Sequence, residues 1–128
     1  MSIPRTPLVL LVDDHEDTRS LYVEYLQGQG FRAEAVGDGA TALRTIRRER
    51  PDLLIMDVKM PDMDGFTVLE ALKRDETLRT IPVVILSADV APPVRRRAIE
   101  MGSAEFVSKP CLPNELLAIV RRMIAPTC

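Results

Sequence analysis

Residues 54–66 read "LIMDVKMPDMDGF", and the character of this stretch changes at its fourth residue. Leu54, Ile55 and Met56 continue an apolar run, which is typical of a strand that is covered on both faces. The run ends at Asp57 and is followed by "PDMDG", whose residues favour a turn that leads into a helix. A carboxylate where a buried strand ends is either a helix cap or a reactive group at the mouth of a site.

The same change from apolar strand to amphipathic helix recurs along the whole chain. Continuous apolar runs predict strands at 8–12, 53–56 and 83–86, and the more alternating segments 31–36 and 105–108 suit edge strands. Between them apolar residues recur at helical spacing. Strands that alternate with helices predict an α/β fold with a parallel sheet and helices on both faces. The predicted helix faces carry Leu21, Tyr22, Tyr25 and Leu26, then Ala42, Leu43 and Ile46, and finally Leu116, Leu117, Val120 and Ile124.

Proline and glycine residues fall where this division puts the ends of elements. None of the ten prolines interrupts a predicted helix, where the missing N–H would cost about 3 kcal/mol. Gly30 and Gly102 stand where helices stop in a left-handed conformation. The 128 residues therefore predict a single domain spanning 1–128, with a core of about 8–124 and short terminal tails.

Composition and charge exclude several classes of protein. The net charge of −2 argues against direct nucleic-acid binding, which needs a basic surface. No apolar run approaches the roughly 20 residues that span a bilayer, so no membrane insertion is expected. The start lacks a secretion signal. Cys111 and Cys128 have no metal-ligand spacing, and we expect unpaired thiols in a cytoplasmic protein.

Polar side chains follow four of the five predicted strands. Asp13 and Asp14 come after the first, Asp57 ends the third, Ser87 follows the fourth and Lys109 follows the fifth. In a parallel sheet with helices on both faces, sites form outside the carboxyl ends of the strands. Three acids, one hydroxyl and one amine are thus expected at a single edge.

This combination predicts phosphoryl chemistry. Three neighbouring carboxylates repel one another unless a cation neutralises them, and their oxygens suit Mg2+ better than zinc. His15 stands beside the acids but has no partner cysteine or histidine. A lysine opposite the acids is able to hold an incoming anion, so the predicted substrate is a phosphoryl group with a carboxylate as its acceptor.

Each residue taken alone also has a structural explanation. Asp13, Asp14 and Asp57 are of the type that caps helices or forms turns, Ser87 is suited to cap a helix, and Lys109 alone fits an exposed surface position. Capping does not require a lysine opposite three acids, which favours the functional interpretation of the whole set. Two further acids of the opening stretch, Asp62 and Asp64, are expected to serve only in the turn and as helix caps.

From Leu8 to Ile124 the chain resembles the receiver domain of two-component response regulators. The resemblance rests on "VDDHED", "MDVKMPDMDGF", "LSAD" and "VSKP", in this order at the ends of the first, third, fourth and fifth strands. It implies a flavodoxin-like, doubly wound five-stranded parallel sheet with strand order 2-1-3-4-5 and five helices.

The resemblance also implies a role for each residue at the metal. Asp57 is expected to accept a phosphoryl group from a sensor histidine kinase or a phosphotransfer protein, with Mg2+ as cofactor. Asp14 would bind the metal directly, Asp13 mainly through water, and Lys59 through its main-chain carbonyl. The domain assists its own phosphorylation and dephosphorylation and is not expected to be an enzyme. The alternative is a Mg2+-dependent phosphatase with an aspartyl nucleophile, disfavoured because Lys59 occupies the place of that family's second acid.

In the same family, Lys109 pairs with the phosphoryl group and Ser87 hydrogen-bonds to it after transfer. The aromatic at the position of Phe106 then turns inward, which implies a downstream partner at the face near Arg95, Phe106 and the last helix. The bond between Lys109 and Pro110 resembles the family's cis peptide.

Three further features of the sequence lead to hypotheses. Lys59 and Asp89 are expected either to pair across the entrance of the site and restrict attacking water, or to be two solvated charges. Residues 95–97, "RRR", fit a solvated helix surface or contact an acidic partner or a second copy. Cys111 is expected to alter packing near the output face.

Overall fold

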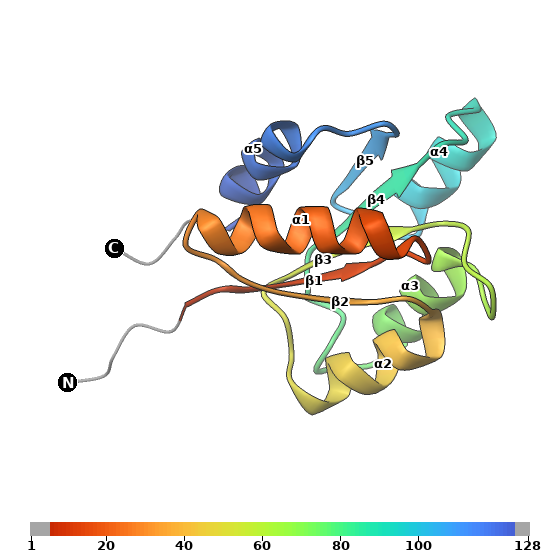
Figure 1. Ribbon diagram of the computed structural model, residues 1–128. Coiled ribbons are helices and arrows are strands. Elements are labelled where there is room, and N and C mark those ends of the chain that lie inside the picture. Colours follow the sequence, from red (N-terminus) through yellow and green to blue (C-terminus); the bar gives the residue numbers. More distant parts are fainter. Residues whose placement is uncertain (1–5, 125–128) are drawn as a thin grey trace.

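The computed structural model of the protein describes residues 6–124. Five parallel strands form one sheet in the order β2-β1-β3-β4-β5, and helices lie on both faces of it (Figure 1). The predicted fold class and strand order are therefore confirmed. None of the helices described has the length and apolar character needed to cross a membrane. The elements are β1 (Leu8–Val12), α1 (Glu16–Gly28), β2 (Arg32–Val36), α2 (Gly39–Arg48), β3 (Leu53–Asp57), α3 (Gly65–Arg74), β4 (Val83–Ser87), α4 (Pro92–Glu100), β5 (Glu105–Ser108) and α5 (Pro113–Met123).

The central strands carry apolar residues without alternation because both faces of the sheet are covered. Val9, Leu11 and Ile55 point to the side where α1 and α5 pack. Leu10 and Leu54 point to the other side, where α2, α3 and α4 pack. Every residue of β1, β3 and β4 is buried, so successive side chains enter opposite halves of the core.

The strands at the two edges of the sheet are less buried, as their alternating sequences predict. β2 exposes Arg32 and Glu34, and Ser108 of β5 is exposed. The helix ends at Gly30 and Gly102 are also confirmed, because their φ angles are +92° and +96°. In this left-handed region glycine is the favoured residue.

One predicted helix face is wrong at a single position. Leu21 was expected to share the buried face of α1 with Tyr22 and Leu26, but its side chain is 52% exposed while Leu26 is fully buried. Helical spacing defines a face broader than the stripe that the sheet covers, and Leu21 lies outside that stripe. α4 is the least buried of the helices described, since Ala98 is its one buried residue.

Parallel pairing brings the carboxyl ends of β1, β3, β4 and β5 to the same edge of the sheet. Among the described residues, four polar side chains are buried, namely those of Asp13, Thr45, Asp57 and Ser87. Three of them stand at this edge. Burial of a carboxylate without a partner is costly, so the edge requires compensating charge.

The difference between Leu21 and Leu26 gives a test of the core. We expect Leu26→Ala to lower the free energy of unfolding by about 2–5 kcal/mol, because it leaves a cavity between α1 and the sheet. Leu21→Ala, on the exposed side of the same helix, is expected to change it by less than about 0.5 kcal/mol. Urea denaturation measures both. Equal losses in the two variants would contradict the packing described.

Candidate functional site

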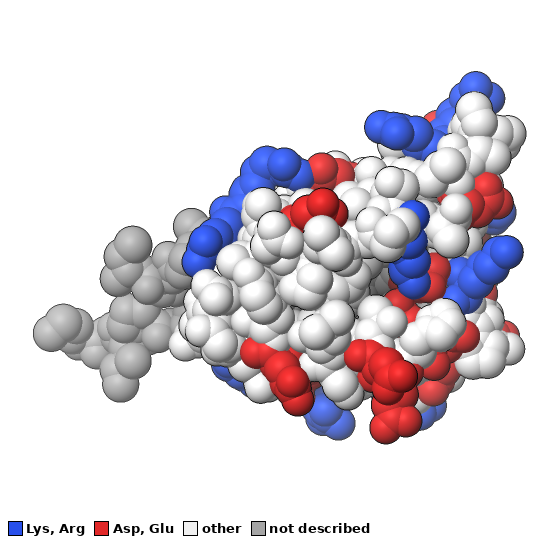
Figure 2. Space-filling view, turned by 45° about the horizontal axis from the view of Figure 1, so that its top comes forward, with Lys and Arg blue, Asp and Glu red and all other residues white. Residues whose placement is uncertain are grey.

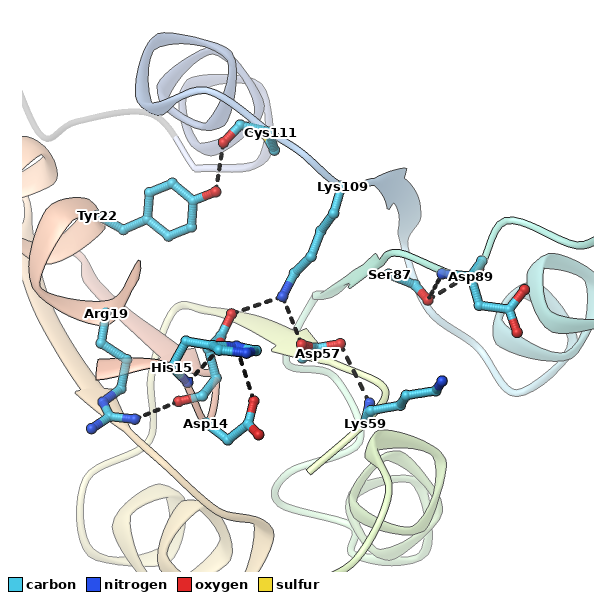
Figure 3. A network of polar contacts seen from close by, with 11 residues as sticks. Asp14, His15, Arg19, Tyr22, Asp57, Lys59, Ser87, Asp89, Lys109 and Cys111 are labelled. Carbon is cyan, nitrogen blue, oxygen red and sulfur yellow. Dashed lines mark hydrogen bonds and ion pairs between the residues drawn. The ribbon is translucent and has the colours of Figure 1, made fainter. Parts of the chain in front are cut away.

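An ammonium group joins two carboxylates from different strands at the edge of the sheet. Lys109 Nζ donates to Asp57 Oδ2 at 2.6 Å and to Asp13 Oδ2 at 2.9 Å (Figure 3). The lysine side chain is 20% exposed and the two acids are more buried still. These contacts connect the ends of β1, β3 and β5. The predicted convergence of Asp13, Asp57 and Lys109 is therefore confirmed.

Asp13 and Lys109 stabilise one another in their charged forms. Burial alone raises the pKa of Asp13, but hydrogen bonds from the His15 backbone N–H and the Lys109 ammonium bring that pKa below its usual value. Burial alone lowers the pKa of Lys109, and the hydrogen bonds to Asp57 and Asp13 more than offset this and raise it. The site therefore holds fixed charges of both signs.

A possible metal site lies beside this lysine. Asp13, Asp14, His15 and Asp57 each offer one ligand atom, and these atoms lie within 4.8 Å of one another. Carboxylate oxygens dominate the set and Asp14 is exposed, which leaves room for water ligands. This donor set fits Mg2+, which prefers oxygen ligands and keeps several waters.

His15 belongs to the cluster although no metal-ligand spacing in the sequence pointed to it. Its Nδ1 lies 2.9 Å from Asp13 Oδ1 and 3.2 Å from Asp14 Oδ1. The hydrogen bond to Asp13, followed by the charge of Asp14, raises the pKa of His15. Adjacency to the two acids was the available signal, and the loop before α1 brings the His15 N–H and ring to Asp13.

The carboxylate of Asp57 faces a pocket of about 310 Å³. Its Oδ1 accepts a long hydrogen bond of 3.3 Å from the main-chain N–H of Lys59. The two oxygens of Asp57 are thus held by Lys109 on one side and by the following loop on the other. The pocket is lined by Asp14, His15, Asp57, Lys59, Ser87, Ala88, Asp89 and Lys109.

Ser87 lines the pocket, but its hydroxyl is engaged with the next loop. Its Oγ donates to the Asp89 carbonyl at 3.0 Å and accepts from the Asp89 N–H at 3.1 Å (Figure 3). It does not cap α4, whose N-cap position is Ala91. Because the hydroxyl has a single hydrogen, donation to a group on Asp57 requires Ser87 to give up its bond to the Asp89 carbonyl.

The expected ion pair between Lys59 and Asp89 is absent from the part of the chain that the structure describes. Asp89 Oδ1 instead accepts from the Ala91 N–H at 3.0 Å, which holds the carboxylate toward the start of α4. Lys59 is exposed. Both side chains line the pocket, and the interpretation as separate solvated charges describes this structure.

The two acids of the "PDMDG" turn have different roles. Asp64 caps α3, because its Oδ1 accepts from the Thr67 N–H at 2.9 Å, as predicted. Asp62 does not cap the helix that follows it. Its two oxygens accept from Gly39 and Ala40 at 2.9 Å each, at the start of α2. The sequence did not reveal this contact, since 23 positions separate Asp62 from Gly39.

The arginines at 95–97 are more than a solvated surface. The guanidinium of Arg95 lies 5.9 Å from the centre of the Phe106 ring, and that of Arg97 lies 4.4 Å from the Phe66 ring. Such cation–π contacts contribute about 0.5–1 kcal/mol at exposed positions. Two of the three arginines therefore hold α4 against β5 and α3.

Cys111 lies just before α5, which belongs to the predicted output face. Its side chain is buried in the core half that holds α1 and α5, and its carbonyl accepts from the Tyr22 hydroxyl at 2.5 Å. Burial raises the pKa of the Cys111 thiol, which keeps it protonated and inert. The Lys109–Pro110 peptide that precedes it is cis, as expected.

The sequence and the fold are similar to those of known signalling proteins. The family model of the response regulator receiver domain matches residues 9–121. Response regulator PleD of Caulobacter vibrioides is 39% identical over 115 residues, which are 90% of this chain and 25% of PleD. The signal receiver domain of a signal transduction histidine kinase from Syntrophus aciditrophicus is 36% identical, with a TM-score of 0.84 and coverage of 92% and 89%.

Another solved structure, the chemotaxis response regulator CheY4 of Vibrio cholerae, has a TM-score of 0.87 at 29% identity. The alignment covers 94% of this chain and 100% of that one. The chain spans about a quarter to a half of the length of the curated relatives it matches.

The charges around Lys109 predict that the free energy of unfolding of the metal-free protein depends on pH. The lowered pKa of Asp13 gives stability that is present above the unfolded pKa, about 3.9, and that is lost as the pH falls through the folded pKa. Lys109→Met removes the ammonium, so burial then opposes the charged carboxylate and raises the pKa of Asp13. We expect lower stability at pH 7 and a smaller fall in the free energy of unfolding between about pH 5 and pH 2.

Urea denaturation at a series of pH values, with a chelator present, measures this slope. Lys73→Met is the matched control, because the Lys73 ammonium donates to the Arg79 carbonyl instead of to an acid of the site. A wild-type slope in Lys109→Met would contradict the charge balance described.

Proposed function

Because the chain belongs to the family of response regulator receiver domains of two-component systems, we propose that it is a phosphoacceptor switch with Asp57 as the acceptor. The donor is a phosphohistidine on a sensor histidine kinase or a phosphotransfer protein. The observation that carries this proposal is the Lys109 ammonium, held between Asp13 and Asp57 at the floor of a pocket. A helix cap or a turn aspartate does not require such an arrangement.

The residues that would hold Mg2+ are Asp14 and Asp57 directly, Asp13 mainly through water, and Lys59 through its main-chain carbonyl. When bound, the ion neutralises negative charge that builds up on the transferring group. Clustering of the carboxylates within 4.8 Å supports this assignment. Asp14 is the most exposed of the three acids at 37% of its side chain, so a metal ion reaches it from solvent.

Transfer needs little covalent chemistry from the protein. A carboxylate oxygen of Asp57 forms a bond to phosphorus while the bond from phosphorus to the donor's histidine nitrogen breaks, and the nitrogen leaves with the electron pair. Lys109 is already within 2.6 Å of Asp57, so its charge is in place for the incoming phosphoryl oxygens. The product is an acyl phosphate, which water later removes.

Turnover of external phosphate esters is not supported. An aspartyl-nucleophile phosphatase of the haloacid dehalogenase type uses a second acid two residues after the nucleophile. Here Lys59 occupies that position, and its main-chain N–H contacts Asp57. The protein is therefore proposed to be a signalling switch that assists its own phosphorylation and dephosphorylation.

The proposed output runs from Ser87 to the face formed by α4, β5 and α5. Ser87 leaves Asp89 to bind the phosphoryl group, and Phe106, half-buried beneath Arg95, turns into the space that opens. This face has a groove of about 580 Å³ with Arg95, Phe106 and Arg122 in its wall. Lys and Arg side chains gather at the end of the molecule where α4 lies (Figure 2), which favours an acidic downstream partner.

The acceptor is tested by incubating the protein with acetyl phosphate and Mg2+ and locating the added mass. We expect a phosphoryl adduct on wild type that is lost in Asp57→Asn and without Mg2+. Asp64→Asn is the matched control, since it changes an acid of the same loop to another good helix cap. Because acyl phosphates are labile, the reaction must be quenched quickly. An undiminished adduct in Asp57→Asn would refute the assignment.

The output path is tested by NMR with beryllofluoride and Mg2+ as a phosphoryl mimic. We expect amide shifts in α4, β5 and α5 to exceed those in α2, and Ser87→Ala to reduce the shifts at Phe106 by more than half. Adduct formation on Asp57 should persist in Ser87→Ala. Shifts confined to the pocket in wild type would rule out this path.

A further inference from the structure

The N-terminus of α2 is capped by two carboxylates from different parts of the chain. Asp38, which immediately precedes the helix, accepts from the Thr41 N–H through its side chain and from the Ala42 N–H through its carbonyl. Asp62 accepts from Gly39 and Ala40. The first three N–H groups of α2, those of Gly39, Ala40 and Thr41, have no partner within the helix and are therefore bonded by side chains, two of them by a residue of the distant β3–α3 loop.

The Asp62 contacts also organise that loop itself. Oδ1 of Asp62 accepts from the Met63 N–H at 2.9 Å as well as from Gly39. Hydrogen bonds from the Gly39 and Ala40 main chain lower the pKa of Asp62, which shows that they favour the charged carboxylate. The Met63 side chain also packs against the start of α2. A Cβ atom on Gly39 would lie 2.4 Å from Met63 Cγ. Gly39 thus permits a close approach of the loop to α2.

The other end of the loop is fixed at the acceptor. The Gly65 N–H donates to the Val58 carbonyl at 2.7 Å. A Cβ atom on Gly65 would lie 2.5 Å from the Asp57 carbonyl oxygen, so the two ends of the segment 58–64 are in backbone contact. Lys59 lies in the loop between Val58, which is bonded to Gly65, and Asp62, which is bonded to α2. The Lys59 N–H donates to Asp57 Oδ1.

We propose that Asp62 is a positioning residue for the phosphoacceptor site: by bonding the start of α2, it holds the β3–α3 loop so that the main chain of Lys59 lies at Asp57. The role of the Lys59 carbonyl as a metal ligand rests on the proposed function. The position of the Lys59 N–H at Asp57 does not, because the structure contains that contact.

The hydrogen bonds of Asp62 have two consequences, one for the stability of α2 and one for the position of the β3–α3 loop. Loss of either carboxylate leaves N–H groups of α2 unbonded and weakens the helix, which is a structural effect that Asp38 and Asp62 share. Asp38 belongs to the β2–α2 connection, and its hydrogen bonds to Thr41 and Ala42 lie within the start of α2 and do not involve the β3–α3 loop. An effect on Asp57 and its cation is therefore expected from Asp62 alone.

The experiment compares Asp62→Ala with Asp38→Ala in three measurements. Urea denaturation gives the stability, and both variants are expected to lose similar amounts. The 15N–1H spectrum of metal-free protein reports the Lys59 amide, which is expected to shift in Asp62→Ala and to stay in place in Asp38→Ala. Mg2+ titration by calorimetry is expected to give an affinity about tenfold weaker in Asp62→Ala and within about twofold of wild type in Asp38→Ala.

A milder pair keeps the test available if the alanine variant does not fold. Asp62→Asn retains an oxygen for Gly39 and Met63 and loses the bond to Ala40, whereas Asp38→Asn remains a good cap. We expect a smaller shift of the Lys59 amide and a few-fold weaker Mg2+ affinity for Asp62→Asn only.

Equal effects of the Asp62 and Asp38 variants, or an unmoved Lys59 amide, would overturn the proposal and leave the acceptor assignment intact. Failure of wild type to bind Mg2+ would contradict the proposed function instead, and the Lys59 amide shift in metal-free protein would still decide the positioning role.

Discussion

The contact between the Lys109 ammonium and the carboxylates of Asp13 and Asp57 is the constraint on which the site depends. Three acids stand at one edge of the sheet, and two of them are buried. Without a cation their mutual repulsion and their desolvation would drive one of them toward protonation. The lysine supplies that charge from a third strand. It therefore holds the ends of β1, β3 and β5 together before any ligand arrives.

Much of this arrangement follows from the sequence because parallel strands impose it. Continuous apolar runs identified β1, β3 and β4, and once those strands are parallel, residues that follow them meet at one edge. The meeting of Asp13, Asp57 and Lys109 at this edge was therefore predictable from the sequence. The edge strands and the helix ends at Gly30 and Gly102 were also predictable, since alternation and left-handed glycine are local signals.

The remaining features depend on distances between elements that a linear sequence does not contain. Asp62 bonds the start of α2, 23 positions away, and Arg97 contacts the ring of Phe66 on α3, which no local pattern of the sequence reveals. Leu21 is exposed because the width of the covered stripe depends on how α1 leans on the sheet. Ser87 was expected beside the acceptor, and its bonds to Asp89 depend on the local course of a loop.

The five helices do not hold the sheet equally. α3 buries Phe66, Val68, Leu69 and Leu72, whereas α4 buries only Ala98. The other contacts of α4 include half-buried Val94 against the core and exposed arginines against aromatic rings. Local opening of a protein costs least where few apolar side chains leave water. α4 is thus the inexpensive place for rearrangement, and it begins five residues after Ser87. In the proposed function, a phosphoryl group at the carboxyl ends of the strands would therefore act on the helix whose displacement exposes the fewest buried side chains.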